Sequence, residues 1–159
     1  MRGFGMRPEL VFRPLAPRDA ERVQEFVRGL SSRSRRERYF SAILELTPRE
    51  LERTTRAQDA RDLSLAAFHG EALVALAECA HGEVAVVVAD AWQGLGLGRE
   101  LMRRLLEHAV RASLPALYGL VRDGNRAMLR LAASFGFRAE SDADPALVHV
   151  ELALAHAWA

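Results

Sequence analysis

The residues best suited by type and spacing to carry chemistry lie between positions 84 and 99. A Val/Ala-rich run, 84–89, leads into three glycines at alternate positions, and an amphipathic helical pattern follows at once. At such a strand-to-helix junction the first helical amides lack an intrahelical acceptor, and the helix dipole favours an anion. Glycine lets a phosphate approach the backbone closely. The sequence therefore predicts a phosphate-binding turn made by Gln93, Gly94, Leu95, Gly96, Leu97, Gly98 and Arg99.

The spacing of the glycines argues against two common phosphate motifs. A Walker loop ends in Gly-Lys-Ser/Thr, but all 22 basic residues of this chain are arginine. A dinucleotide-binding fingerprint needs a third glycine three positions after Gly96, where this chain has Arg99. Both motifs are poor fits, so the phosphate ligand belongs to another class.

The pattern Gln93-x-x-Gly96-x-Gly98 resembles the Gln/Arg-x-x-Gly-x-Gly/Ala signature of GNAT acetyltransferases. A second likeness is Asn125, which precedes a helical pattern that closes with Gly136-Phe137. The likeness covers residues 63–137 and implies acetyl-CoA as co-substrate, with no metal. It also implies that amides near Val86 and Val88 and the side chain of Asn125 bind the pantetheine arm, while the glycine turn binds the pyrophosphate.

A narrower likeness concerns residues 30–40, the Thr47-Pro48 helix start and residues 87–93, which resemble the catalytic domain of Pat-type protein lysine acetyltransferases. It implies that the acceptor is a protein lysine, for example in an acyl-CoA synthetase, and that the acetyl group passes directly to the amine. Two alternatives stay open. The chain could acetylate a small-molecule amine, or it could bind acyl-CoA as a sensor without transferring the acyl group.

Acetyl transfer needs a group that removes a proton from the amine, because a free lysine has a pKa of about 10.4. The Pat-type resemblance implies that Glu83, at the start of the strand before the glycine turn, is this base. Glu78 is the reserve candidate, and a solvated strand-end glutamate is the plain alternative for Glu83. Many GNAT enzymes have a tyrosine seven residues after the asparagine. This chain has Ala132 there, which leaves the general acid unassigned.

The elements that must position these residues follow from periodicity and turn residues. We expect a single domain, 1–159, of the α/β class, and the resemblance implies the GNAT fold: a mixed, mostly antiparallel sheet with helices on both faces. The run 83–89 reads as a strand buried on both faces, and Tyr39, Phe40 and Ile43 as the apolar side of a helix. The expected strands are 10–15, 63–68, 72–79, 83–89, 116–121 and 147–154, and the expected helices are 19–30, 31–43, 48 onward, 97–110 and 125–135.

Composition limits the partners. The formal charge is +1, which gives no bulk attraction for nucleic acid, and the histidines show no metal-ligand spacing. One cysteine, Cys79, and the lack of an apolar run near 20 residues predict a cytoplasmic protein without a membrane span. The arginine run 33–38 fits a nucleic-acid patch, a solvated helix face or, by the Pat-type resemblance, a helix beside the acceptor groove whose arginines meet acidic residues near a target lysine. The oligomeric state stays open.

Overall fold

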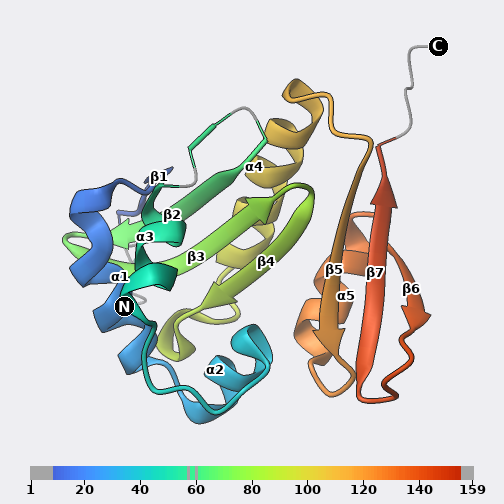
Figure 1. Cartoon of the computed structure of the whole chain (residues 1–159), viewed down its shortest axis with the longest axis horizontal. Helices are drawn as coiled ribbons and strands as arrows, with labels where there is room; N and C mark the ends of the chain where they lie inside the picture. The colour runs from blue at the N-terminus through green and yellow to red at the C-terminus, as the bar shows by residue number, and fades with distance from the viewer. Residues whose placement is uncertain (1–8, 57, 60, 155–159) are drawn as a thin grey trace, which may run out of the picture.

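The described part of the chain, residues 9–56, 58–59 and 61–154 of the computed structural model, forms one seven-stranded sheet with helices packed on it (Figure 1). The strand order is β1-β2-β3-β4-β5-β7-β6, and every neighbouring pair is antiparallel except β4–β5. The predicted mixed, mostly antiparallel α/β sheet is confirmed. The strands are β1 (Val11–Pro14), β2 (Leu63–His69), β3 (Ala72–Ala80), β4 (Glu83–Val88), β5 (Ala116–Arg122), β6 (Arg138–Ser141) and β7 (Leu147–Ala153).

The helices lie on both faces, but they cover the two faces unequally. On one face α4 and α5 bury a core that spans the sheet, in which Leu101 and Leu105 of α4 meet Leu117 of β5. On the other face α1 and α3 pack over β2–β4 only, with Val23 and Val27 against Leu76. On that face Tyr118 and Leu120 of β5 are 37% and 40% exposed. The α-helices are α1 (Ala20–Gly29), α2 (Ser32–Tyr39), α3 (Pro48–Arg56), α4 (Leu97–Arg111) and α5 (Arg126–Ser134), and the short 3-10 helices are η1 (Pro17–Asp19) and η2 (Asp90–Trp92).

Local signals in the sequence set several of these boundaries. Ser31 caps α2 by accepting a hydrogen bond from the Ser34 amide at 3.1 Å. Thr47 and Glu50 form a capping box at the start of α3, with side chain-to-amide distances of 3.2 Å in both directions. The β2–β3 hairpin turns at Gly70, whose φ is 61°. The expected helix starts near positions 31 and 48 and the expected pair of strands on either side of Gly70 are confirmed.

Two expectations are wrong, one about the burial of a strand and one about the end of a helix. The strand 83–89 ends at Val88, and only Val84 and Val87 in it are buried, because the other valines border an open cavity. The helix expected to reach position 43 ends at Tyr39. Phe40 follows in the left-handed region, with φ of 59°, and is 42% exposed. The chain leaves the helix there so that Leu46, a few residues later, can enter the core beneath α1.

The pairing between β4 and β5 is limited to one end. Glu83 lies opposite Tyr118, and the Tyr118 amide donates to the Gly82 carbonyl oxygen at 2.9 Å. Beyond this point the two strands diverge, as Figure 1 shows, and β5 pairs along its length with β7 instead. The carboxyl-terminal half of β4 therefore has an edge with no ladder partner on the β5 side, inside an otherwise continuous sheet.

Candidate active site

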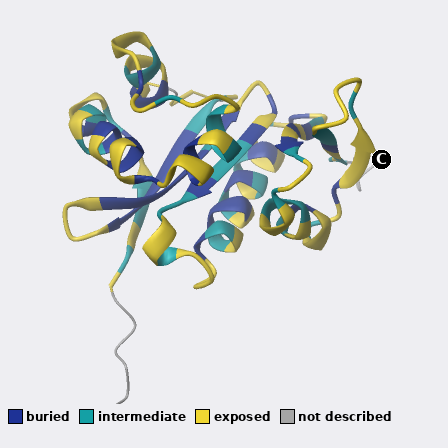
Figure 2. Ribbon diagram, turned by 90° about the horizontal axis from the view of Figure 1, so that it is seen from below, coloured by how far each residue is buried: buried dark blue, intermediate teal, exposed yellow. Residues whose placement is uncertain are grey.

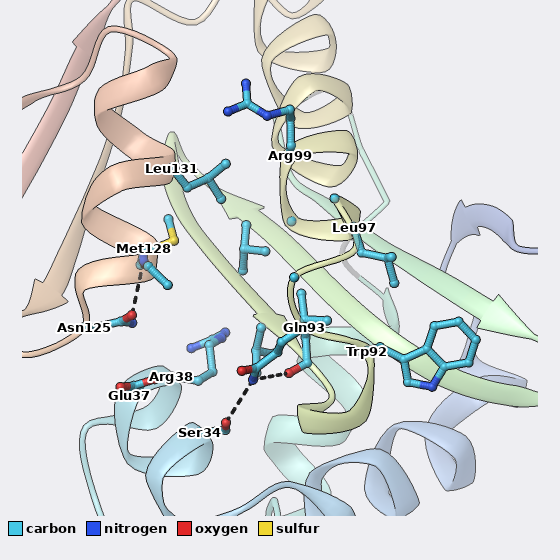
Figure 3. Close-up of a pocket in the computed structure, with 17 residues that line it drawn as sticks. Ser34, Glu37, Arg38, Trp92, Gln93, Leu97, Arg99, Asn125, Met128 and Leu131 are labelled. Carbon is cyan, nitrogen blue, oxygen red and sulfur yellow. Dashed lines mark hydrogen bonds between the residues drawn. The ribbon is translucent and has the colours of Figure 1, made fainter. Parts of the chain in front are cut away.

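A cavity of about 320 Å³ occupies the split between β4 and β5 (Figure 3). Four segments that are distant in sequence form its walls: the end of β4, the glycine turn, the start of α5 and α2. All predicted cofactor-binding residues line it except Leu95, which is 64% exposed and points elsewhere. The lining comprises Ser34, Glu37, Arg38, Val86, Val87, Val88, Trp92, Gln93, Gly94, Gly96, Leu97, Gly98, Arg99, Asn125, Ala127, Met128 and Leu131.

The glycine turn presents bare backbone amides to this cavity. Gly94 and Gly96 have φ of 77° and 88°, and a Cβ at either would meet nothing within 4 Å. Gly96 is the N-cap of α4 and supplies no capping side chain, and the first intrahelical bond runs from the Glu100 amide to the Gly96 carbonyl at 3.1 Å. The amides of Leu97–Arg99 are left without an acceptor among the described residues. This arrangement suits a bound anion.

Gly98 keeps the cavity open between β4 and α5. A Cβ at this position would lie 3.4 Å from Leu131 Cδ2, and 3.9 Å and 4.0 Å from the γ-carbons of Val88 and Val86. A side chain here would therefore bridge the two walls. The glycine leaves space for a narrow ligand that runs along β4 toward the turn.

Asp90 joins the glycine turn to α2. Its carboxylate accepts from the Ser31 amide at 3.0 Å, from Ser31 Oγ at 2.8 Å and from Ser34 Oγ at 3.1 Å. Burial alone would raise the pKa of Asp90, but these hydrogen bonds outweigh it and lower the pKa. Gln93 adds a second contact, since its Nε2 donates to the Val88 carbonyl at 3.1 Å. The side chain of Gln93 therefore braces the turn against β4.

Through Asp90, α2 brings residues to the cavity that sequence reasoning missed. Glu37 and Arg38 lie at its inner end and Ser34 near Gln93 (Figure 3). The contacts that place them join positions 56 to 59 residues apart. The Pat-type resemblance predicts that the run 33–38 lies beside the acceptor groove, but no local pattern predicts that Ser34, Glu37 and Arg38 line the cofactor cavity. The long-range contacts with Asp90 and Gln93 identify that position.

Asn125 stands at the opposite wall as the N-cap of α5. Its Oδ1 accepts from the Met128 amide at 3.2 Å, which leaves its side-chain NH₂ as the group that can donate to a ligand carbonyl. Asn125 also borders two neighbouring cavities, described below. Asn125 therefore lies where the three cavities meet.

A smaller cavity, about 60 Å³, continues from the first one toward the start of β4. The two share Glu37, Arg38, Val86, Asn125 and Met128. The smaller one adds Phe40, Glu83, Val84, Ala85, Gly119, Leu120, Val121, Phe137 and Val150. This passage brings Glu83, the predicted base, to the side of the split that faces α2, across from the glycine turn.

Glu78 and Glu83 lie on the same face of the sheet and differ in their partners. The Arg38 guanidinium forms an ion pair with Glu78. Burial opposes the charge of Arg38, but Glu78, with a smaller contribution from Glu83, raises the pKa of Arg38. The Glu83 carboxylate has no hydrogen bond or ion pair in the described part of the chain and is exposed. Of the two candidates, Glu83 is the one free to take a proton.

The other candidate groups lie away from the cofactor cavity. Ala132, at the position of the family's tyrosine, is 1% exposed and packs in the core. Burial raises the pKa of Tyr39 to about 12, and neither Tyr39 nor Tyr118 lines that cavity. Cys79 is buried, which raises the pKa of its thiol. His81 sits in an exposed turn with φ of 51°.

Within residues 9–56, 58–59 and 61–154 no group of three or more His, Cys, Asp or Glu side chains could hold a metal ion. No helix in them is long and apolar enough to cross a membrane.

A fold with a split between its fourth and fifth strands, and a glycine turn that opens a helix at the split, defines an acyltransferase-type site. The sequence model of the acetyltransferase (GNAT) family matches residues 29–137, so the chain belongs to this family. An acetyltransferase from Pseudomonas aeruginosa is 31% identical over 145 residues, which is 85% of this chain and 78% of that protein. The predicted family membership is confirmed.

Solved structures share the fold. The GNAT domain of PAT from S. lividans superposes with a TM-score of 0.83 and 24% identity, covering 90% of this chain and 89% of that one. The structure of yncA from Salmonella typhimurium with its cofactor acetyl-CoA has a TM-score of 0.74 and 20% identity, covering 92% and 94% of the two chains. The predicted GNAT fold is therefore confirmed.

Proposed function

We propose that this protein transfers the acetyl group of acetyl-CoA directly to the side-chain amine of a protein lysine, for example in an acyl-CoA synthetase. One observation carries the proposal. Two cavities meet across the β4–β5 split, with bare amides at the start of α4 on one side and the free carboxylate of Glu83 on the other. Acetyl-CoA, the acetyl donor, and the acceptor amine can thus meet at the split in the sheet.

The donor side fits coenzyme A in shape and charge. The amides of Gly94–Arg99 would hold the pyrophosphate, and the unpaired edge of β4 near Val86 and Val88 would hydrogen-bond the pantetheine arm. Asn125 would donate its side-chain NH₂ to an amide carbonyl of that arm. The family match and the acetyl-CoA bound to yncA support this choice of ligand. Acetyl-CoA supplies a thioester and a thiolate leaving group.

The chain's own groups would then act on the acceptor amine. Glu83 takes a proton from the amine, directly or through a water, so that its nitrogen can form the new C–N bond at the thioester carbon. Amides of β4 donate to the oxyanion that develops there. The C–S bond breaks, and the thiolate takes a proton from solvent, since its pKa is near 8.5 and no tyrosine of this chain lines the cavity.

The passage beside Glu83 favours a lysine side chain as the acceptor. Its walls combine apolar side chains, Phe40, Leu120 and Met128 among them, with charged and polar ones that include Glu83, and it is narrow, at about 60 Å³. An unbranched aliphatic stem with an amine at its tip suits such walls, because the methylenes bury against them while the amine reaches a carboxylate. We place the reaction in the cytoplasm, where a thiol such as Cys79 stays reduced.

The main alternative is a module that binds acyl-CoA without transfer, and the core alanine at position 132 is the observation that favours it. Incubation with labelled acetyl-CoA, a lysate and a purified acyl-CoA synthetase distinguishes these functions. Labelled lysines, mapped by mass spectrometry, are the expected result, and they must belong to other proteins because this chain has no lysine. Tight acetyl-CoA binding with no labelled protein would contradict the proposal. Labelled small amines alone would indicate a small-molecule acetyltransferase.

A further inference from the structure

Arg38 lies at the junction where the cofactor cavity meets the passage to Glu83. It is one of the five residues that line both spaces, and the basic one among them. Figure 3 shows its side chain extending from α2 into the end of the cavity, across from Asn125. In the proposed function the thioester of acetyl-CoA lies at this junction, because the donor occupies one space and the acceptor amine occupies the other.

The guanidinium of Arg38 keeps a donor that its protein contacts do not use. The side chain is only 18% exposed, and its Nη2 pairs with the carboxylate of Glu78. Its Nε is buried and has no hydrogen-bond partner in the described part of the chain. A buried donor without an acceptor costs free energy. The Nε–H group therefore suits an acceptor atom of a bound ligand.

The groups around Arg38 keep it positively charged. Burial opposes the charge, but Glu78, Tyr39 and Glu83 outweigh it and raise the pKa of the guanidinium. Burial raises the pKa of Tyr39 to about 12, so this phenol stays neutral near neutral pH. Glu37, the other charged residue of the junction, forms its ion pair with another arginine of α2. Because a guanidinium does not give up its proton in proteins, Arg38 can stabilise negative charge but cannot act as a general acid.

We propose that Arg38 is a catalytic residue that stabilises the coenzyme A thiolate as the C–S bond breaks. The electron pair of that bond goes to the sulfur, which accepts a hydrogen bond from Arg38, while the amine proton goes to Glu83. The thiolate later takes its own proton from solvent. Ala132 stands where many GNAT enzymes have a tyrosine, so charge stabilisation takes the place of proton donation. The inference rests on the placement of acetyl-CoA in the proposed function and is independent of which amine accepts the acetyl group.

Two ligands, coenzyme A and desulfo-coenzyme A, which lacks the sulfur, test this role without any acceptor. The Kd of each is measured by calorimetry with the full-length protein between pH 7 and pH 10. An adjacent arginine lowers the pKa of a thiol, so coenzyme A should bind more tightly as the pH rises toward the ordinary thiol pKa of about 8.5 and beyond. Desulfo-coenzyme A reports every other titrating group. We expect the ratio of the desulfo-coenzyme A Kd to the coenzyme A Kd to rise about tenfold, as for a shift of about one pKa unit.

Substitutions of the ion pair assign the effect to Arg38. In Arg38→Gln this ratio should stay constant across the pH range, and kcat for acetyl transfer should fall. Glu78→Gln removes the carboxylate that offsets the guanidinium, so the ratio should rise more steeply than in the wild type. Adding Arg38→Gln to Glu78→Gln should make the ratio constant again. This double variant leaves no unpaired carboxylate at position 78, so it keeps the test valid if Arg38→Gln alone does not fold.

Arg36→Gln is the matched control, because it removes one charge from the same helix. Arg36 lines a third cavity, of about 540 Å³, between the start of α2 and the end of β5, and neither of the two spaces that meet at Arg38. It is one of the exposed residues of α2, whose outer side faces solvent (Figure 2). The variant should keep the wild-type ratio at every pH.

Three outcomes would overturn the proposal, and they differ from one another. A ratio that is independent of pH in the wild type refutes stabilisation of the thiolate and leaves acetyl transfer intact. A ratio that rises as steeply in Arg38→Gln as in the wild type refutes the role of Arg38, and an equal loss of affinity for both ligands would then make it a structural residue of the cavity wall. If neither ligand binds the wild type, the placement of the donor in the proposed function is wrong, and this inference with it.

Discussion

Glu83 and Glu78 are two carboxylates on one face of the sheet with different surroundings. Arg38 pairs with Glu78, and this contact occupies the carboxylate that sequence reasoning kept in reserve. Glu83 borders the acceptor passage with no partner of its own in the described part of the chain. Arg38 lines both the cofactor cavity and this passage, and its pair with Glu78 joins α2 to β3. Its pair with Glu78 therefore positions the passage and leaves Glu83 available for proton transfer.

The first prediction concerns Glu83→Gln, which keeps the shape of the side chain and removes its basicity. We expect kcat to fall by about 10²–10⁴-fold, because a positioned general base typically contributes that much. The affinity for acetyl-CoA, measured by calorimetry, should be unchanged, since Glu83 does not line the cofactor cavity. Glu71→Gln is the control, because Glu71 lies in the β2–β3 turn with a side chain 93% exposed. Full activity of Glu83→Gln at neutral pH would move the role to Glu78.

At the scale of elements, the glycine turn and the start of α5 form opposite walls of the cavity that, in the proposed function, binds acetyl-CoA. Gly96 acts through its backbone, and its φ of 88° is one that L side chains rarely adopt. Asn125 acts through a side chain that also caps α5. Substitutions at Gly96 and Asn125 should therefore weaken acetyl-CoA binding by different factors.

We predict that Gly96→Val weakens acetyl-CoA binding more than tenfold and that Asn125→Ala weakens it only several-fold. Valine would be strained at this φ and would extend into the space of the pyrophosphate, whereas alanine removes a contact worth about 1 kcal/mol. Calorimetric titration measures both. Gly70→Val is a matched control, with φ of 61° and open space around its Cβ but no place in the cavity lining. The reverse ranking would show that the Asn125 match is accidental.

The bond network between η2 and α2 leads to a third prediction. Asp90→Ala should lower the free energy of unfolding by about 1 kcal/mol, since the lost hydrogen bonds are partly exposed to solvent. It should also raise KM for the acceptor, because α2 forms one wall of the acceptor passage. Urea unfolding and initial-rate kinetics measure these effects. The double variant Asp90→Ala with Ser31→Ala should lose little more unfolding free energy than Asp90→Ala alone, because the two residues share the same contacts. Additive losses would contradict this network.

The pKa of Asp90 sets the pH at which this stabilisation disappears. Its pKa is lower in the folded state than in the unfolded chain, where the ordinary value is about 3.9. The stabilisation is therefore complete above that ordinary value and is lost as the pH falls through it toward the folded value. The stability difference between wild type and Asp90→Asn should be constant near neutral pH and shrink below about pH 4. A constant difference down to pH 3 would contradict the assignment.

Features governed by neighbours in sequence could be predicted, and features governed by distant contacts could not. The helix start at Thr47-Pro48 and the two strands that flank Gly70 depend on residues within a few positions, and both were predicted. The end of α2 at Tyr39 depends on where Leu46 must pack, which periodicity does not show. The Arg38–Glu78 pair joins positions forty residues apart. The resemblance therefore placed the run 33–38 beside the acceptor groove, but the sequence did not predict that Ser34, Glu37 and Arg38 also line the cofactor cavity.

At the scale of the whole molecule, the split divides the sheet into two parts joined at one β4–β5 residue pair and by the core under α4 and α5. A ligand that fills the split contacts both parts at once, through the unpaired edge of β4 and the start of α5. Binding should therefore stabilise the fold as a whole.

We predict that coenzyme A at a hundred times its Kd raises the Tm by about 5–10 °C. Linkage gives about 2.7 kcal/mol at that concentration, and each kcal/mol shifts the Tm of a domain of this size by about 2–4 °C. Differential scanning fluorimetry measures the shift. Gly96→Val should show little of it at the same concentration. A shift confined to a local probe on α2, with no change in global unfolding, would contradict a ligand that joins the two parts.

The cofactor cavity and the passage to Glu83 also differ in most of their walls. Gly98 and Leu131 line the cofactor cavity, whereas Phe40 and Leu120 line the passage. In the proposed function, acetyl-CoA and the acceptor therefore occupy different cavities and can be bound at the same time. Initial-rate plots should therefore intersect, as for a ternary complex, and the acetylated product can dissociate while coenzyme A is still bound. Coenzyme A should compete with acetyl-CoA but not with the acceptor. Parallel plots would indicate a covalent acetyl-enzyme and would contradict direct transfer.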